Sequence, residues 1–128
     1  MSVGRAFLSS AQALSTVADG DEGYGNAIAL LAVHACVSLA DALAIGYAEV
    51  KSTAGDHAAV VPMLRDIFRQ QLPADVEKAL RSVVTSKDEI AYQGRYYPLQ
   101  DGQRLLARAE AFSTWATRVY EERPTTGE

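Results

Sequence analysis

The sequence predicts an all-α protein, an up-and-down bundle of four to five helices. Apolar residues recur at helical spacing from about residue 5 to residue 121, and no stretch alternates apolar and polar residues as a strand does. Short runs of turn-forming residues separate these periodic segments. With 128 residues, the chain is long enough for a single domain around one core. We therefore expect one domain, with residues 1–4 and 123–128 disordered.

The first two helices are expected over residues 5–17 and about 25–50. The first places Phe7, Leu8 and Leu14 on one side, and an acidic, glycine-rich loop follows it. The second is apolar on nearly all sides, which is typical of a helix surrounded by other helices.

One line of polar residues interrupts the second helix. His34, Ser38 and Asp41 follow one another at intervals of three or four residues, so they share one side of the helix. A buried carboxylate is costly unless it is paired, so we expect Asp41 to have a partner distant in sequence. The line forms either a structural hydrogen-bond network inside the bundle or, with Asp41 as an orienting group, part of a site at a cleft.

The same helix is long enough to cross a bilayer. Asp41 lies near its middle, where an aspartate costs about 2.5–3.5 kcal/mol on insertion into a membrane. No basic cluster flanks the segment. We therefore expect the central helix of a soluble bundle and no membrane contact.

A third helix follows a break at residues 52–55. Asp56 can cap it by accepting backbone N–H bonds, and His57 then heads an inward stripe that ends at Phe68. Pro62 should kink this helix or shift its start.

The fourth and fifth helices are expected from about Pro73 and over residues 101–121. Residues 86–89 read Ser-Lys-Asp-Glu, a capping-box pattern that predicts a new helical turn or a bend. Gly94 should end the fourth helix, and Pro98 favours an extended connection before the fifth.

Composition limits the classes of function. The net charge of −4 argues against indiscriminate binding to nucleic acid, although a local basic cleft remains compatible with it. Cys36 is the only cysteine, so no intrachain disulfide forms, and a buried thiol in a reducing compartment is expected. The first residues lack the apolar stretch of a signal peptide, so we expect a cytoplasmic protein.

Lys51 and His57 are the leading candidates for chemistry. At a helix N-terminus the macrodipole favours a neutral imidazole that can accept a proton, and the free N–H groups attract anions. A nearby lysine can stabilise negative charge on a phosphoryl oxygen. Together these groups suit metal-independent cleavage of RNA. The alternative is an ordinary helix end, with Lys51 in solvent and His57 packed under a loop.

A second cluster combines Tyr92, Tyr96 and Tyr97 with Arg95 and Lys87. Aromatic side chains interleaved with cations can stack bases and hold phosphates, or they can seal the end of a helical bundle. The helical Glu-x-x-His pairs of di-metal bundles are missing from the sequence, so we expect neither a metal nor another cofactor.

Three stretches resemble the HEPN superfamily of small helical nucleotide-binding bundles. They are the alanine-rich residues 32–43 with Asp41 inside, the Gly-Asp-His at 55–57 after the break, and residues 86–92 on the fourth helix. The resemblance covers about residues 5–121. It implies a symmetric homodimer in which an arginine and a histidine four to six residues later cleave RNA without metal. His57 matches that histidine, and Lys51 stands in place of the arginine, without its bidentate fork.

The resemblance leaves two functions open. The first is an RNA- or nucleotide-associated protein, with or without weak endoribonuclease activity of a toxin–antitoxin type, in which Lys51, His57 and Asp41 form the site. The second is a non-catalytic module that binds a second copy or a cognate partner such as a small nucleotidyltransferase.

Overall fold

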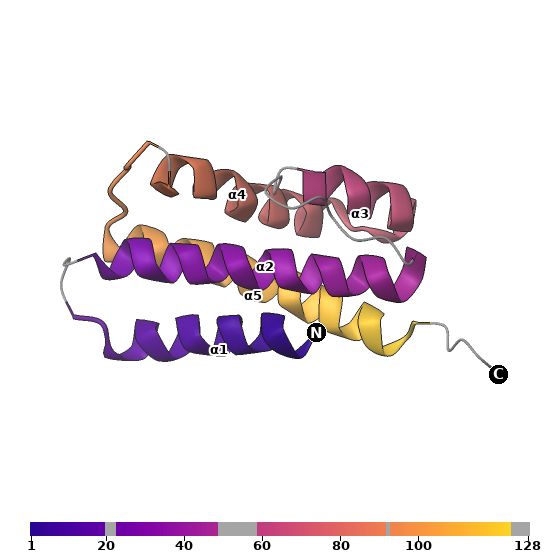
Figure 1. The fold of residues 1–128 in the computed structure, drawn as a ribbon, viewed down its shortest axis with the longest axis horizontal. Coiled ribbons are helices and arrows are strands. Elements are labelled where there is room, and N and C mark those ends of the chain that lie inside the picture. The colour runs from indigo at the N-terminus through magenta and orange to yellow at the C-terminus, as the bar shows by residue number, and fades with distance from the viewer. Residues whose placement is uncertain (20–22, 49–58, 92, 124–128) are drawn as a thin grey trace.

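The computed structural model describes residues 1–19, 23–48, 59–91 and 93–123. Within these ranges the chain is an all-α bundle, as predicted. Its elements are α1 (Ser2–Val17), α2 (Tyr24–Ala48), α3 (Val60–Phe68), the 3₁₀ turn η2 (Arg69–Gln71), α4 (Ala74–Ala91) and α5 (Leu99–Glu121). Figure 1 shows α1, α2, α4 and α5 running alternately in opposite directions, with the short α3 added beside α4.

The central element is α2, which contacts α1, α3, α4 and α5. Small side chains on α2 allow the neighbouring helices to approach closely. Its fully buried alanines are Ala29, Ala32, Ala35, Ala40 and Ala44. Larger side chains fill the remaining space, with Phe112 of α5 and Leu39 and Leu43 of α2 completely buried. The apolar pattern of the second helix thus predicted its place in the core correctly.

The beginning of the chain differs from expectation. Residues 1–4 were expected to be disordered, but α1 begins at Ser2. Gly4 is buried, and a Cβ there would lie 2.7 Å from Cγ of Leu39. The first turn of α1 therefore packs against α2, which orders it.

Two expectations about helix ends have different outcomes. Pro62 lies in the first turn of α3, where its missing N–H is no loss, so it marks the start of the helix rather than a kink. The bend expected at Ser86 was wrong, because α4 continues to Ala91. The buried Ser86 hydroxyl donates to the Val83 carbonyl at 2.6 Å, so it is satisfied within the helix and caps nothing.

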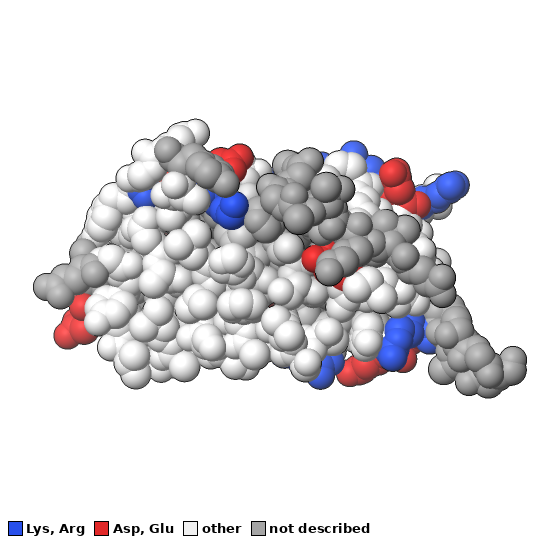
Figure 2. Space-filling model, in the orientation of Figure 1, with Lys and Arg blue, Asp and Glu red and all other residues white. Residues whose placement is uncertain are grey.

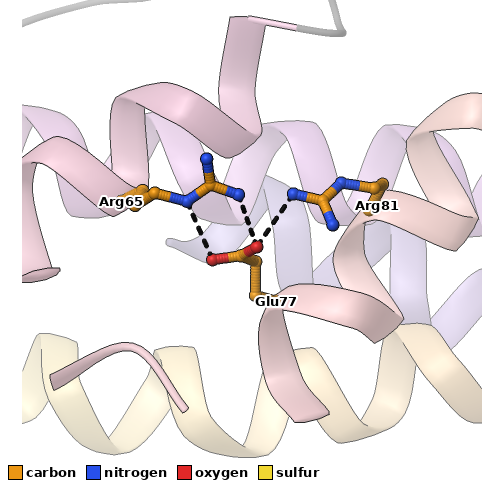
Figure 3. A network of polar contacts seen from close by, with 3 residues as sticks. All are labelled: Arg65, Glu77 and Arg81. Carbon is orange, nitrogen blue, oxygen red and sulfur yellow. Dashed lines mark hydrogen bonds and ion pairs between the residues drawn. The ribbon is translucent and has the colours of Figure 1, made fainter. Parts of the chain in front are cut away.

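An ion-pair network fastens α3 to α4 (Figure 3). Arg65 of α3 donates from Nε and Nη2 to the two carboxylate oxygens of Glu77, at 3.1 and 2.5 Å. Arg81, one turn further along α4, donates to the same carboxylate at 2.8 Å. The hydrogen bond from Arg65, followed by that from Arg81, lowers the pKa of Glu77. This bidentate geometry fixes where α3 lies on α4.

The starts of α2 and α5 meet the connection between α4 and α5 in direct backbone contact. A Cβ at Gly25 would lie 2.1 Å from the carbonyl oxygen of Tyr97, and one at Gly102 would lie 2.4 Å from the carbonyl oxygen of Gly25. Asn26 completes the contact, since its side chain donates to the Arg95 carbonyl at 2.9 Å and accepts from the Tyr97 N–H at 2.9 Å. No side chain larger than hydrogen fits at either glycine.

Replacing Gly25 or Gly102 by alanine is therefore expected to destabilise the bundle. Overpacking costs about 1–3 kcal/mol and sometimes more, and here the obstacle is backbone rather than a movable side chain. Thermal and urea unfolding followed by circular dichroism measure the loss.

Gly46→Ala is the matched control. Its Cβ would lie 3.1 Å from the flexible Arg123 side chain and in ordinary contact with the Tyr120 ring, at 3.6 Å, and meets no backbone. In a helix interior alanine is more favourable than glycine by about 1 kcal/mol. Unchanged or higher stability is expected for this variant. Equal stability of all three variants would contradict the backbone contact.

Candidate functional site

The two leading candidates, Lys51 and His57, lie outside the described residues. The flanking helices are described, since α2 ends at Ala48 and α3 begins at Val60, but the break predicted at residues 52–55 lies outside the described residues as well. The roles proposed for both residues stay predictions.

Asp41, the third candidate, lies at a surface hollow of about 490 Å³. The hollow is bordered by the beginning of α1, the second half of α2 and the end of α5. Its other lining residues are Met1, Ser38, Ala42, Ile45, Gly46, Tyr120 and Arg123. Asp41 is half-buried rather than enclosed by the bundle, so the expectation of a buried carboxylate was wrong. Asp41 therefore lies at the surface of the bundle, on the border of the hollow.

His34 also differs from expectation. It is exposed, and its ring stacks on Phe7 of α1 with 5.3 Å between centroids and 27° between planes. Figure 1 shows α2 between α1 on one side and α3 and α4 on the other, with α5 behind it. One side of α2 is therefore left uncovered by the described helices. His34 is exposed and Ser38 and Asp41 are half-buried, so the polar line lies at the surface of the bundle, beside α1, rather than at its centre.

The cluster around Tyr97 closes one end of the bundle. Tyr97 is only 7% exposed, and its hydroxyl donates to Glu89 at 2.8 Å. Arg95 pairs with the other oxygen of Glu89 and lies over the Tyr97 ring, 5.2 Å from its centroid. For Tyr97 the sealing interpretation is confirmed. Tyr96 is 52% exposed, and Tyr92 lies outside the described residues.

These contacts shift the acidity of the groups involved. Burial, together with the bond to Glu89, raises the pKa of Tyr97 to about 12. The hydrogen bond from Tyr97, followed by that from Arg95, lowers the pKa of Glu89. Glu89 is therefore a fixed anion at neutral pH and a poor choice for a general base.

Beside this cluster lies a smaller hollow of about 230 Å³ between α4 and α5. We call it the arginine hollow. It is lined by Ser82, Glu89, Arg95, Tyr97, Asp101, Arg104, Leu105 and Arg108. Sequence reasoning identified Arg95 and Tyr97 but missed Arg104 and Arg108. Their spacing of one turn on the polar side of the fifth helix was the available signal.

The described residues give less support to metal or cysteine chemistry. In the part of the chain that the structure describes, no group of three or more His, Cys, Asp or Glu residues is placed to hold a metal ion. Cys36 is completely buried, and burial raises the pKa of its thiol, so the thiol is inert as a nucleophile.

No protein-family model, curated protein or solved structure matches this chain. The resemblance to the HEPN superfamily therefore rests on the sequence motifs alone. Among the described residues one helix, Tyr24–Ala48, is long and apolar enough to cross a membrane, and 56% of its most apolar part is buried in the bundle. The core helix of a soluble protein meets the same criterion.

The lowered pKa of Glu89 predicts a pH dependence of stability. A carboxylate whose folded pKa is depressed contributes stability above its unfolded pKa, about 4.3, and loses it as the pH falls through the folded value. Glu89→Gln should therefore destabilise the protein at pH 7, and its difference from wild type should shrink below about pH 4. Urea unfolding across this range measures the difference.

Glu121→Gln provides the control, because the Glu121 carboxylate lies 3.8 Å from Arg5 and both side chains are at least half exposed. Such pairs contribute little. If Glu89→Gln keeps the same difference from wild type at every pH, the assigned pairing is wrong.

Proposed function

We propose that the protein is a HEPN-like, RNA- or nucleotide-associated bundle with weak, metal-independent endoribonuclease activity. In this proposal His57 acts as the acid or base, Lys51 stabilises the phosphate, and Asp41 orients them. The observation that carries it is the position of Asp41, half-buried at a surface hollow on the helix that leads into the segment with Lys51 and His57. The five-helix layout also agrees with the family that the motifs resemble.

The setting of such an activity is part of the proposal. A cytoplasmic protein would meet RNA and nucleotides and would keep its single Cys36 reduced. A role in a toxin–antitoxin pair would supply a cognate partner that restrains cleavage.

The experiment is cleavage of a fluorescent RNA in excess chelator. His57→Ala should lower the rate at least about 100-fold, because a positioned acid or base typically contributes that much or more. Lys51→Ala should lower it similarly, whereas Lys51→Arg should keep or raise it, since arginine grips a phosphate with two donors. Asp41→Asn should lower the rate less and displace the pH–rate profile, because Asp41 acts through His57.

His34→Ala is the matched control, since His34 is exposed and stacks on Phe7 away from the lining of the Asp41 hollow. It should cleave like wild type. Equal cleavage by wild type and His57→Ala would reveal a contaminating nuclease, and no cleavage by wild type would remove the enzymatic proposal.

A second candidate function, binding of another protein chain, rests on a separate observation. Figure 2 shows a face that is mostly uncharged, with most visible charged groups towards its margins. On α1 an exposed seam recurs at intervals of three or four residues, like the contact positions of paired helices. The seam consists of Val3, Ala6, Ser10, Ala13 and Val17. We propose a second copy of this chain as its partner, with a cognate protein as the alternative.

Ala13→Glu tests the seam. Glutamate is a good helix former, so an exposed site should tolerate it, but a charge at a helix–helix contact should weaken association. Sedimentation velocity should show wild-type dimers and at least about a tenfold higher dissociation constant for the variant.

Ala111→Glu is the matched control, an exposed alanine on α5 whose replacement adds the same charge. It should associate like wild type. A wild type that stays monomeric at high concentration would remove the second copy as partner, and binding of a cognate protein lost in Ala13→Glu would support the alternative.

A further inference from the structure

The arginine hollow combines cations from two elements. Arg95 belongs to the connection before α5, while Arg104 and Arg108 lie one turn apart on α5. Two carboxylates, Glu89 and Asp101, share the hollow with them. Three arginines against two carboxylates leave a positive excess, in a protein whose net charge is −4.

The three arginines differ in how far they are neutralised. Arg95 is paired with Glu89, whose other oxygen accepts from Tyr97. Arg104 lies 3.4 Å from Asp101 with most of its side chain exposed, a weak arrangement. Arg108 has no carboxylate partner among the residues described, and its Nη1 donates to the Ser82 hydroxyl at 2.5 Å.

The contact between Arg108 and Ser82 leaves donors available for an anion. A guanidinium has five N–H donors, and a hydroxyl that accepts one bond still has its own proton to donate. The contact also joins α4 to α5, so both groups are held at the wall of the hollow. Arg104 supplies a second guanidinium one turn away.

We propose that the arginine hollow binds the phosphate group of a small phosphomonoester, with Arg108, Arg104 and Ser82 as its donors. Guanidinium groups match the geometry of phosphate oxygens and hold them with paired hydrogen bonds. At about 230 Å³ the hollow is smaller than pockets that enclose a whole small molecule, about 300–1,000 Å³. It therefore suits the anionic end of a ligand whose remainder stays outside.

The charge of a phosphomonoester also suits the hollow. It carries about 1.5 to 2 negative charges at neutral pH, whereas a phosphodiester within RNA carries one. Three arginines against two carboxylates give the hollow a positive excess, and its attraction for an anion grows with the charge of that anion, which favours the phosphomonoester. This site does not include Lys51 or His57, so the proposal of phosphate binding is tested separately from the proposed cleavage of RNA.

The experiment is a titration of the full chain with inorganic phosphate, 5′-AMP, adenosine and the phosphodiester ApA, followed by calorimetry and by NMR. Inorganic phosphate and AMP should bind saturably, ApA at least about tenfold more weakly, and adenosine not at all. Equal affinity for inorganic phosphate and AMP would mean that the phosphate alone is recognised. Tighter binding of AMP would mean that the nucleoside adds contacts outside the hollow.

Three variants test the named donors. Arg108→Ala should weaken phosphate binding about tenfold or more, and Arg108→Lys should weaken it less, since lysine keeps the charge but loses the paired donors. Asp101→Asn should tighten binding, because it removes a repulsive charge from the hollow. If these residues had only a structural role, Arg108→Ala and Asp101→Asn would not change the affinity for phosphate in opposite directions.

Arg118→Ala is the matched control, an exposed arginine on the same helix outside the lining of the hollow. It should bind like wild type. No saturable binding of phosphate, equal binding of adenosine and AMP, or an equal loss in the Arg118 and Arg108 variants would overturn the proposal. Melting curves establish whether each variant is folded. If Arg108→Ala does not fold, the affinities of Arg108→Lys and Asp101→Asn for phosphate test the proposal instead.

Discussion

The backbone contact among Gly25, Gly102 and Tyr97 is the constraint on which the rest of the described bundle depends. It brings the first turns of α2 and α5 against the connection that leaves α4. Asn26 then replaces the hydrogen bonds that this extended stretch cannot make within a helix. Three separate parts of the chain are therefore locked at one end of the bundle.

The same contact places the polar groups nearby. Because the connection is fixed, Tyr97 points inward to Glu89, and Arg95 lies over the Tyr97 ring. The left-handed backbone of Gly94, with φ of 65°, lets the chain leave α4 in this direction, as the Arg95 N–H donates back to the Glu89 carbonyl. The wall of the arginine hollow is thus a result of how the helix ends meet.

Much of this fold was predictable from the sequence, because apolar periodicity reports directly on which residues are buried. What periodicity could not show is which side of α2 remains uncovered. Its apolar residues surround the axis, so the exposure of His34 and Asp41 depends on where α1, α3 and α4 pack. The bend predicted at Ser86 was wrong for a related reason. The hydroxyl of a serine in a capping-box pattern can also be satisfied by a hydrogen bond within a continuous helix. The arginine hollow depends on pairing between helices, such as that of Ser82 with Arg108, which a single sequence does not report.

The glycine pair also has an evolutionary consequence. At positions 25 and 102 any side chain would collide with a neighbouring backbone, so descendants that keep this architecture can accept substitutions there only by moving two helices at once. Exposed positions of α1 outside its seam carry no such restriction. Distant homologues should therefore keep a glycine in the first turn of each of these two helices, with an asparagine after the first glycine, even where the rest of the sequence has diverged.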